Sequence, residues 1–361
     1  MNNLDFNAFL LIVRKYYSGD NCQPLQFSFQ DNKIQIHYRA DIAKHTLVYD
    51  YQTLVITLGG AIEYARNALI AQKITNIHIH FDINLASIDV NKDADNICTI
   101  SEGDKTLELE PIAVDVLQAR TTDRRAYLAH SANDIDVERL NRQLSRVNCS
   151  VLTQLPADTL KFFAWSDSQV WLSKPLGLDI LNAVNFENDC PDVGLPKKNL
   201  GVSAVELMPI RLVQKYPKLF NVFAAMGFQK GMQGSQLKLW KSAQSAILFT
   251  LNDKQTVEEK TLASAEMMHV ILQLTSAGYS VQPSTLSTEI LNIPIKQYDE
   301  NLSTATSIDF TPEFKRINNV RQQLHITDEQ QVLWLLRIGK PSSAFPNDAK
   351  TGRRNIQSIT R

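Results

Sequence analysis

The sequence has few cysteines, and none has a metal-binding or redox spacing. The four, Cys22, Cys98, Cys149 and Cys190, lie far apart, and no Cys-x-x-Cys pair occurs. This pattern argues against a zinc site and against a disulfide framework, and it is typical of reduced thiols in a reducing compartment. We therefore expect a cytoplasmic protein.

Long hydrophobic runs are also missing. The longest apolar run near the start, residues 9–13, is too short to span a bilayer. Asp5 precedes that run where a signal peptide would carry basic residues, so we expect neither a signal peptide nor a membrane partner.

The chain has no excess of charge of either sign. Its 37 lysines and arginines face 38 aspartates and glutamates, which gives a net charge of −1 and a pI of about 6.7. This balance gives no sign of the positive charge excess that binding to nucleic acid or to an anionic membrane requires. The one basic-rich segment is the tail from Lys350 to Arg361.

The common glycine-rich phosphate signatures are missing as well. The sequence contains no Gly-x-Gly-x-x-Gly and no Walker A motif. Gly231-Met-Gln-Gly234 does not follow a clear strand, so we interpret it as a mobile loop. His78 and His80 alternate on one strand, but no third ligand is in view, and we expect polar positions facing solvent and no metal site.

Hydrophobic periodicity predicts a mixture of helices and strands in a chain of 361 residues with 44% hydrophobic content. We expect helices over residues 4–17, 49–73, 134–146, 155–171 and 262–277, and strands over 26–30, 33–38, 77–81, 246–251 and 331–338. Helices 59–73 and 262–277 are similar in length and apolar content, which hints at a duplicated half. Residues 174–235 lack regular periodicity, so we expect a functional cover, a binding loop or a disordered segment there.

Arg120-Thr-Thr-Asp-Arg-Arg-Ala-Tyr127 is the most polar of the candidate binding segments. In an extended chain Arg120, Thr122 and Arg124 would point to one side, because side chains alternate along a strand. Two guanidinium groups and a hydroxyl form a set of donors suited to a phosphate or to the polar edge of a heterocycle. The alternative interpretation is a solvated basic edge before a helix.

Four segments together resemble the FMN-dependent nitroreductase family. Asn21-Cys-Gln-Pro-Leu-Gln-Phe27 resembles the family's Asn-x-Gln-Pro-Trp-x-Phe segment, and the segment from Arg120 to Tyr127 resembles its Arg-x-Ser/Thr-x-Arg-x-x-Phe segment. Trp334-Leu-Leu-Arg-Ile-Gly339 and the pair Arg353-Arg354 look like its closing strand and phosphate-binding tail. Their order, with the long helix at 54–73, is similar to that of the Acg-like branch, in which two nitroreductase-like halves are fused.

The resemblance implies an FMN site. Arg120 and Thr122 would hold the phosphate and ribityl chain, and Arg124 would lie beside the pyrimidine edge, where a cation eases hydride acceptance. Asn21 and Gln23 would supply amides at the polar edge of the ring. Ser264 and Ala265 would form a turn where a small residue lets the backbone approach flavin N5. The cations that close over the phosphate would come from Lys350, Arg353 and Arg354. No catalytic side chain is expected, because the flavin carries the chemistry. Two positions depart from the family pattern: Leu25 replaces a common tryptophan, and Ser264 replaces a usual glycine.

The resemblance also implies a fold. It is an α+β, nitroreductase-like three-layer sandwich, with a mixed, mainly antiparallel sheet, helices on both faces and two related halves. Residues 1–115 would form the N-terminal half, and residues 116–361 the C-terminal half with the arginine motif, a candidate lid at 174–235 and the basic tail. A fused chain would form internally the interface of ordinary family dimers, and further homodimerisation is left open.

The implied activity is hydride transfer from NAD(P)H through FMN to a small-molecule acceptor, whose identity the sequence does not give. The alternative is a non-catalytic FMN-storage protein with a lid over the flavin. A third interpretation is a subunit of a biosynthetic complex that binds no flavin.

Overall fold

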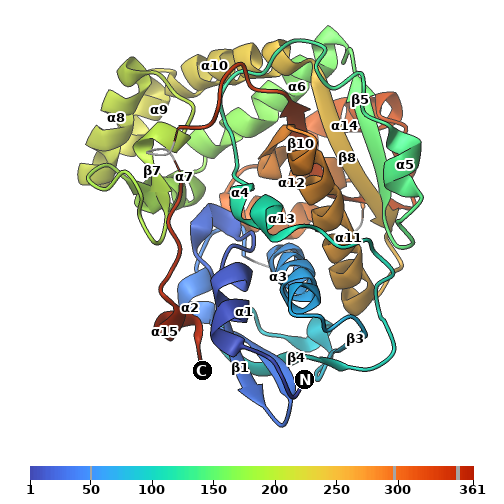
Figure 1. Ribbon diagram of the computed structural model, residues 1–361. Helices are drawn as coiled ribbons and strands as arrows, with labels where there is room; N and C mark the ends of the chain where they lie inside the picture. The colour runs from blue at the N-terminus through green and yellow to red at the C-terminus, as the bar shows by residue number, and fades with distance from the viewer. Residues whose placement is uncertain (49–50, 296–297, 347–349) are drawn as a thin grey trace.

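Two four-stranded antiparallel sheets form the framework of the chain (Figure 1). The computed structural model describes residues 1–48, 51–295, 298–346 and 350–361. The first sheet has the order β1-β2-β4-β3 and consists of β1 (Leu25–Gln30), β2 (Lys33–Tyr38), β3 (Ile77–His80) and β4 (Ala94–Glu102). The second has the order β5-β8-β10-β9 and consists of β5 (Asn148–Thr153), β8 (Ser245–Asn252), β9 (Ser280–Pro283) and β10 (Gln330–Gly339).

The helices fall into two groups along the chain. Around the first sheet and before the second lie α1 (Phe6–Val13), α2 (Ala40–Ala43), α3 (Gln52–Ala71), α4 (Val114–Ala119) and α5 (Val137–Asn141). Within and after the second sheet lie α6 (Ala157–Ser168), α7 (Lys174–Ala183), α8 (Ala204–Lys215), α9 (Phe220–Ala225), α10 (Phe228–Ala243), α11 (Val257–Ser276), α12 (Thr285–Asn292), α13 (Tyr298–Thr306), α14 (Phe314–Gln323) and α15 (Ile356–Ile359). Residues 174–243, which include α7 to α10 and the short parallel pair β6 (Val184–Asn185) and β7 (Leu195–Pro196), are called the helical insertion below.

The β1–β2 hairpin has the tight turn that its sequence predicts. Asp31 and Asn32 separate the strands and have φ values of 50° and 59°. Two central residues with positive φ are typical of a type I′ turn, whose twist matches that of the flanking strands. Leu25 pairs with Tyr38, and Gln30 with Lys33, so the strands predicted over 26–30 and 33–38 are confirmed and form a hairpin.

Helices α3 and α11 pack against each other at the centre of the molecule (Figure 1). Each has 20 residues, and α11 starts with a capping box between Thr256 and Glu259. Their close approach depends on Gly59, because a Cβ atom there would overlap Ser264 Cβ and lie 2.8 Å from the backbone nitrogen of Ala265. Within the described residues α3 is the one helix long and apolar enough to cross a membrane, but most of it is buried in this core.

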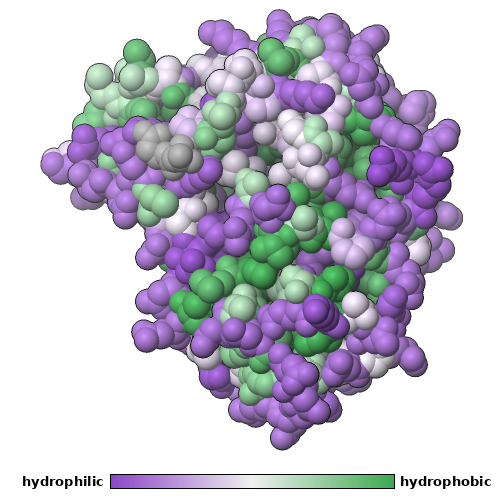
Figure 2. All heavy atoms as spheres, viewed as in Figure 1, coloured by the Kyte–Doolittle hydropathy of each residue, from purple (hydrophilic) through white to green (hydrophobic). Residues whose placement is uncertain are grey.

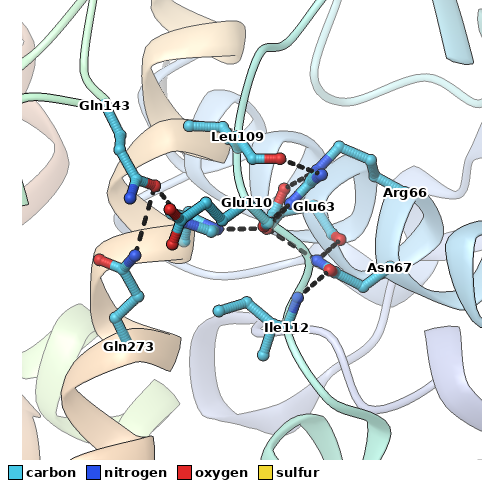
Figure 3. A network of polar contacts seen from close by, with 9 residues as sticks. Glu63, Arg66, Asn67, Leu109, Glu110, Ile112, Gln143 and Gln273 are labelled. Atoms are coloured by element: carbon cyan, nitrogen blue, oxygen red, sulfur yellow. Dashed lines mark hydrogen bonds and ion pairs between the residues drawn. The ribbon is translucent and has the colours of Figure 1, made fainter. Parts of the chain in front are cut away.

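A buried polar network links these two helices (Figure 3). The Glu63 carboxylate accepts from Arg66 Nε at 2.7 Å and lies 2.9 Å from His269 Nδ1. Asn67 donates to the same carboxylate, and Arg66 also donates to the carbonyl of Leu109. Burial opposes ionisation of Glu63, but the charge of Arg66 and the hydrogen bonds hold its pKa below the ordinary value. The network therefore contains a fully buried ion pair.

The two sheets have the same order and the same position for their long helix. In the first, α3 connects the second strand to the edge strand β3, and in the second α11 connects β8 to the edge strand β9. Chain segments also cross between the sheets. Thr122 forms a parallel bridge with Val281 of β9, while Thr360 near the C-terminus forms one with Phe27 of β1. Each sheet is thus extended by a segment that follows the other sheet in sequence.

The layers differ between the sheets. One hydrophobic core lies between the first sheet, the α3–α11 pair and one face of the second sheet, and another lies between the opposite face of the second sheet and α6, α10, α12 and α14. The outer face of the first sheet is polar and carries Ser28, Gln35, His37 and Thr99. The architecture is α+β with mainly antiparallel strands, as expected, and helices cover both faces of the second sheet.

Two secondary-structure predictions are wrong. The helix expected over 134–146 is reduced to α5, because the backbone N–H groups of Ser145 and Arg146 donate to the buried carboxylate of Glu266 and hold that segment in another conformation. Residues 174–235 are mostly helical, and Gly231 and Gly234 lie inside α10 and not in a loop.

Candidate functional site

A cavity of about 900 Å³ lies between the start of α3, the segment from Arg120 to Arg124, the second sheet and the helical insertion. In Figure 2 the outline of the molecule is notched below the insertion, which projects at the upper left. The volume falls within the range of small-molecule and cofactor sites. The cavity wall includes Tyr17, Asp20, Asn21, Cys22, His45, Arg120, Thr122, Arg124, Asp179, Asn199, Arg211, Gln214, Lys215, Trp334 and Arg353.

The arginine segment is extended, and its alternate residues separate only in part. Arg120, Thr122 and Arg124 all line the cavity as predicted, but so does the intervening Thr121. Arg120 Nε donates to the hydroxyl of Tyr64 at 3.0 Å, and Arg124 Nη1 donates to the side-chain oxygen of Asn199 in the insertion. Asp123 and Arg125 pair with each other at 2.7 Å and lie outside the cavity wall. The structure therefore brings three of the predicted residues together.

The turn before β1 is strained. Asp20, Asn21 and Gln23 have φ values of 46°, 57° and 55°, in the left-handed region that non-glycine residues rarely adopt. Ser18 Oγ accepts from the backbone N–H of Gln23 at 3.0 Å and helps to hold the turn closed. Strain of this kind costs free energy that the surrounding contacts must supply, and it is common at binding sites.

Asn21 lines the cavity, but Gln23 does not. Asn21 Nδ2 donates to the carbonyls of Asp192 and Gly194 in the insertion, each at 3.3 Å. Gln23 is 1% exposed, its amide nitrogen donates to Asp192 at 2.8 Å, and its oxygen accepts from the backbone N–H of Arg354. The structure thus places Gln23 behind the wall, where it ties the insertion and the tail to the turn.

Arg353 enters the cavity wall from the C-terminal tail. Its Nη1 donates to Asn21 Oδ1 at 2.6 Å and to Thr351 Oγ1 at 2.7 Å, while its buried Nε has no partner in the described part of the chain. Burial, followed by repulsion from Arg120, lowers the pKa of Arg353 to about 10. Even at that value the guanidinium is charged at neutral pH.

The cations around this end of the cavity form no ion pair with a carboxylate in the described part of the chain. Among the ion pairs of residues 1–48, 51–295, 298–346 and 350–361, none involves the six cations Arg14, Lys15, Arg120, Arg124, Arg353 and Arg354. Burial lowers the pKa of Lys15, and repulsion from Arg353 and Arg14 adds to that effect. Of the six, Arg120 is buried and the others are half-buried. Cations held away from water without a counter-ion are costly, so this arrangement favours a bound anion.

Lys350 and Arg354 are not in the cavity wall. Lys350 is exposed. Arg354 Nε donates to the carbonyl of Cys22 at 3.2 Å, on the outer side of the turn. Of the three predicted tail cations, only Arg353 is placed at the cavity.

The prediction of a turn at Ser264 and Ala265 is wrong. Both residues lie in the middle of α11 and are completely buried, and Ser264 faces Gly59 of α3. The small side chains allow the two helices to pack closely, and neither residue lines the cavity.

Trp334 of β10 is a cavity residue that the sequence reasoning did not assign as a ligand contact. It is 2% exposed, and its indole N–H has no partner among the described residues. Tyr17 packs edge-on against it with ring centroids 4.7 Å apart, and the guanidinium of Arg120 lies 5.8 Å from the Tyr17 ring. The sequence contains a signal for this role, because a buried tryptophan in a mostly aliphatic strand usually has a hydrogen-bond partner for its N–H.

The helical insertion and the α2–α3 connection form the opposite wall. Asp179 of α7 accepts from the backbone N–H of Thr46 at 2.6 Å and fastens the insertion to that connection. His45 Nε2 lies 3.2 Å from the Asp20 carboxylate. Burial opposes protonation of His45, but the nearby Asp20 carboxylate prevails and raises the pKa of His45 above the ordinary value.

The site lacks an activated nucleophile among the described residues. Burial raises the pKa of the Cys22 thiol to about 12, so it stays protonated. No group of three histidines, cysteines or carboxylates that could hold a metal occurs in the part of the chain that the structure describes. The residues present fit an anionic ligand with an aromatic or polar ring system.

Comparisons with known proteins give fold-level likenesses only. No family model and no curated protein matches the chain. Among solved structures, it is similar to the FMN and NADPH-dependent nitroreductase NfnB from sphigopyxis sp. strain HMH, with 13% identity, 67% of this chain and 93% of that chain covered, and a TM-score of 0.34. It is also similar to a nitroreductase-like family protein from Bacillus cereus, with 15% identity, 68% and 91% covered and a TM-score of 0.31. A further match is the FMN-dependent nitroreductase NfnB from Mycobacterium smegmatis in complex with NADPH, with 12% identity, 68% and 95% covered and a TM-score of 0.32. Likenesses of this size assign no residue of the chain to a role.

Proposed function

We propose that the chain is an FMN-binding, nitroreductase-like oxidoreductase that takes hydride from NAD(P)H and passes it to a small acceptor. The observation that carries the proposal is the convergence of Arg120, Arg124 and Arg353 on one cavity, where none of the three forms an ion pair with a carboxylate of the described residues. A flavin phosphate supplies close to two negative charges and matches this excess.

The residues present fit FMN. Arg353 Nε and Trp334 Nε1 are buried donors without partners in the described residues, and a ligand with hydrogen-bond acceptors would satisfy them. Arg120, Thr122 and Arg353 would bind the phosphate and ribityl end, while Arg124 and Asn21 would orient the polar edge of the ring. FMN, when bound, supplies the hydride chemistry, and the protein contributes binding, orientation and exclusion of water.

We propose further that residues 1–115 and 116–361 are related nitroreductase-like halves of the Acg-like type. The identical strand order of the two sheets and the matching positions of α3 and α11 support this. The crossing bridges Thr122–Val281 and Phe27–Thr360 are what two exchanged subunits would make if they were joined in one chain. We expect about one FMN per chain and keep the cytoplasm as the expected location, because the four cysteines are free.

The test is the visible absorbance spectrum of the protein purified after FMN supplementation, together with the Arg120→Ala/Arg124→Ala double variant. We expect a flavin spectrum in the unchanged protein and its loss in the double variant. Lys350→Ala removes an exposed tail cation and is the matched control, which should keep the flavin. Unchanged flavin content in the double variant would contradict the proposal.

One observation favours a second function, FMN storage without turnover. The helical insertion supplies much of the cavity wall and is fastened across it through Asp192 to Asn21 and through Asn199 to Arg124. NADPH added without oxygen distinguishes the two functions, since bleaching of the bound flavin within seconds indicates a reductase and a persistent spectrum indicates storage.

A further inference from the structure

Exposed apolar side chains are concentrated on α8 and α9 of the helical insertion. Six of the ten large hydrophobic side chains that are exposed in the described residues lie between Val205 and Met226. Val205, Met208 and Met226 are exposed by 79%, 66% and 76% respectively. Figure 2 shows green patches on this projecting part of the molecule, at the upper left. Scattered exposed leucines need no explanation, but a cluster of this kind does.

The exposed side chains on α8 form one stripe. Val205, Met208 and Leu212 are spaced i, i+3 and i+7 and lie on one face of the helix, while Ile210 and Val213 face the core of the insertion. Val222 of α9 and Met226, the residue that caps the end of α9, are spaced i and i+4 and are both exposed. The inner faces of α8 and α9 therefore pack against the rest of the insertion, whereas their outer faces expose apolar side chains to solvent.

The same surface is basic. Lys218 and Lys230 are exposed, and Glu206 is the one carboxylate between residues 204 and 230. Arg211 and Lys215 are exposed too, but both also border the cavity, and Arg211 pairs with Glu187 at 3.2 Å. Glu206 is occupied by its capping box with Ser203 and by a hydrogen bond from Ser235. The segment thus carries a local excess of positive charge in a chain whose net charge is −1. The net charge of the whole chain does not reveal this local excess of positive charge.

We propose that this face, with its apolar stripes on α8 and α9 and the surrounding lysines, docks on the surface of a bilayer that contains anionic lipids. Amphipathic helices with apolar residues beside lysine and arginine bind at the headgroup level, where apolar insertion and attraction to anionic lipid act together. This proposal does not depend on the function proposed above.

The charge distribution disfavours a second copy of the chain as the occupant. A two-fold interface through this face would bring Lys215 and Lys218 of one copy close to those of the other. The gap beneath this surface that is lined by Ile210 and Phe220 holds only about 10 Å³, which is too small for an anchoring side chain of a partner protein. A projecting, basic and apolar face suits a planar anionic surface.

The test is cosedimentation of the full chain with phosphatidylcholine vesicles that either contain or lack about one third phosphatidylserine, at low and high salt. We expect binding to the anionic vesicles alone, with loss at high salt. Lys218→Gln should weaken binding about fivefold, as loss of one cation near an anionic surface does. Met208→Ser with Met226→Ser should weaken it by at least about tenfold.

Leu128→Ser is the matched control, because Leu128 is 50% exposed but lies outside the patch. It should bind like the unchanged protein, and circular dichroism should show the same fold for all variants. Absence of binding to anionic vesicles, or equal binding by the Met208→Ser/Met226→Ser variant, would overturn the proposal. A concentration-dependent dimer that the methionine substitutions abolish, without vesicle binding, would assign the face to a second copy instead.

Discussion

Arg353 Nη1 donates to Asn21 Oδ1 over 2.6 Å, which joins the C-terminal tail to the strained turn before β1. Because Asn21 also donates to the helical insertion, one side chain holds three distant segments of the chain at the cavity. Arg353 and the turn that contains Asn21 thus form a single structural unit. A substitution in either should alter ligand binding at the same end of the cavity.

Arg353→Gln should weaken FMN binding about 10- to 100-fold, because it removes one charged donor from the group that it forms with Arg120 and Arg124. Titration of the apoprotein with FMN, followed by flavin fluorescence, measures the affinity. Lys350→Gln removes a cation of the same tail that is exposed, and its affinity should be unchanged. Equal losses in the two variants would indicate a general charge effect and not a specific contact.

Gly59→Ala should lower the free energy of unfolding by about 1–3 kcal/mol, because the new Cβ would meet backbone atoms of α11 that cannot move aside. Gly60→Ala is the control on the same helix. Its Cβ would lie 3.4 Å from the flexible end of Met268, and the gain in helix propensity should make it neutral or slightly stabilising. Urea unfolding measures both, and an equal effect at the two positions would contradict the proposed close contact.

Glu63→Gln should lower the free energy of unfolding by about 3–5 kcal/mol, because it leaves Arg66 charged and buried without its counter-ion. Asp158→Asn breaks an ion pair with Lys161 of the same i, i+3 spacing, but that pair is exposed. The control should therefore lose less than about 1 kcal/mol. A small effect at Glu63, measured by urea unfolding, would show that the network of Figure 3 contributes little to stability.

His37 should make the protein sensitive to mild acid. Asn96 N–H donates to its Nδ1, so the proton is on Nε2, which lies 2.8 Å from Ser28 Oγ. Burial lowers the pKa of His37 to about 4, whereas the unfolded chain has the ordinary value of 6.5. The unfolded state therefore takes up the proton first, and stability that is present above pH 6.5 is lost as the pH falls from 6.5 toward 4.

The loss should amount to about 3 kcal/mol over that window. Urea unfolding at a series of pH values measures it, and His37→Gln should flatten the profile between those limits. A variant profile as steep as that of the unchanged protein would assign the acid sensitivity to other groups.

Much of the framework could be predicted from the sequence, because its signals are local. The apolar runs of α3, α11, β8 and β10 and the Asp31-Asn32 turn each depend on neighbouring residues alone. The helical insertion was missed because its glycines and prolines obscured the pattern. Ser203 and Glu206 form a capping box that marks the start of α8 and was readable in the sequence.

The site residues that could be predicted are those whose orientation depends only on neighbouring residues in the sequence. The alternation of Arg120, Thr122 and Arg124 follows from an extended backbone, and all three line the cavity. The orientation of Gln23 depends on the path of the insertion and the tail, which no local pattern encodes. Ser264 was misplaced for the same reason, since its small size is required by the facing helix α3 and not by a ligand.

The bridge between Phe27 and Thr360 has a consequence for biosynthesis. During translation β1 leaves the ribosome long before the segment around Thr360 that pairs with its outer edge. That edge therefore stays unpaired throughout the interval, and unpaired edges invite association with other chains. The first sheet reaches its native extent only when the two segments meet, so this edge of the nascent protein is open to aggregation until then.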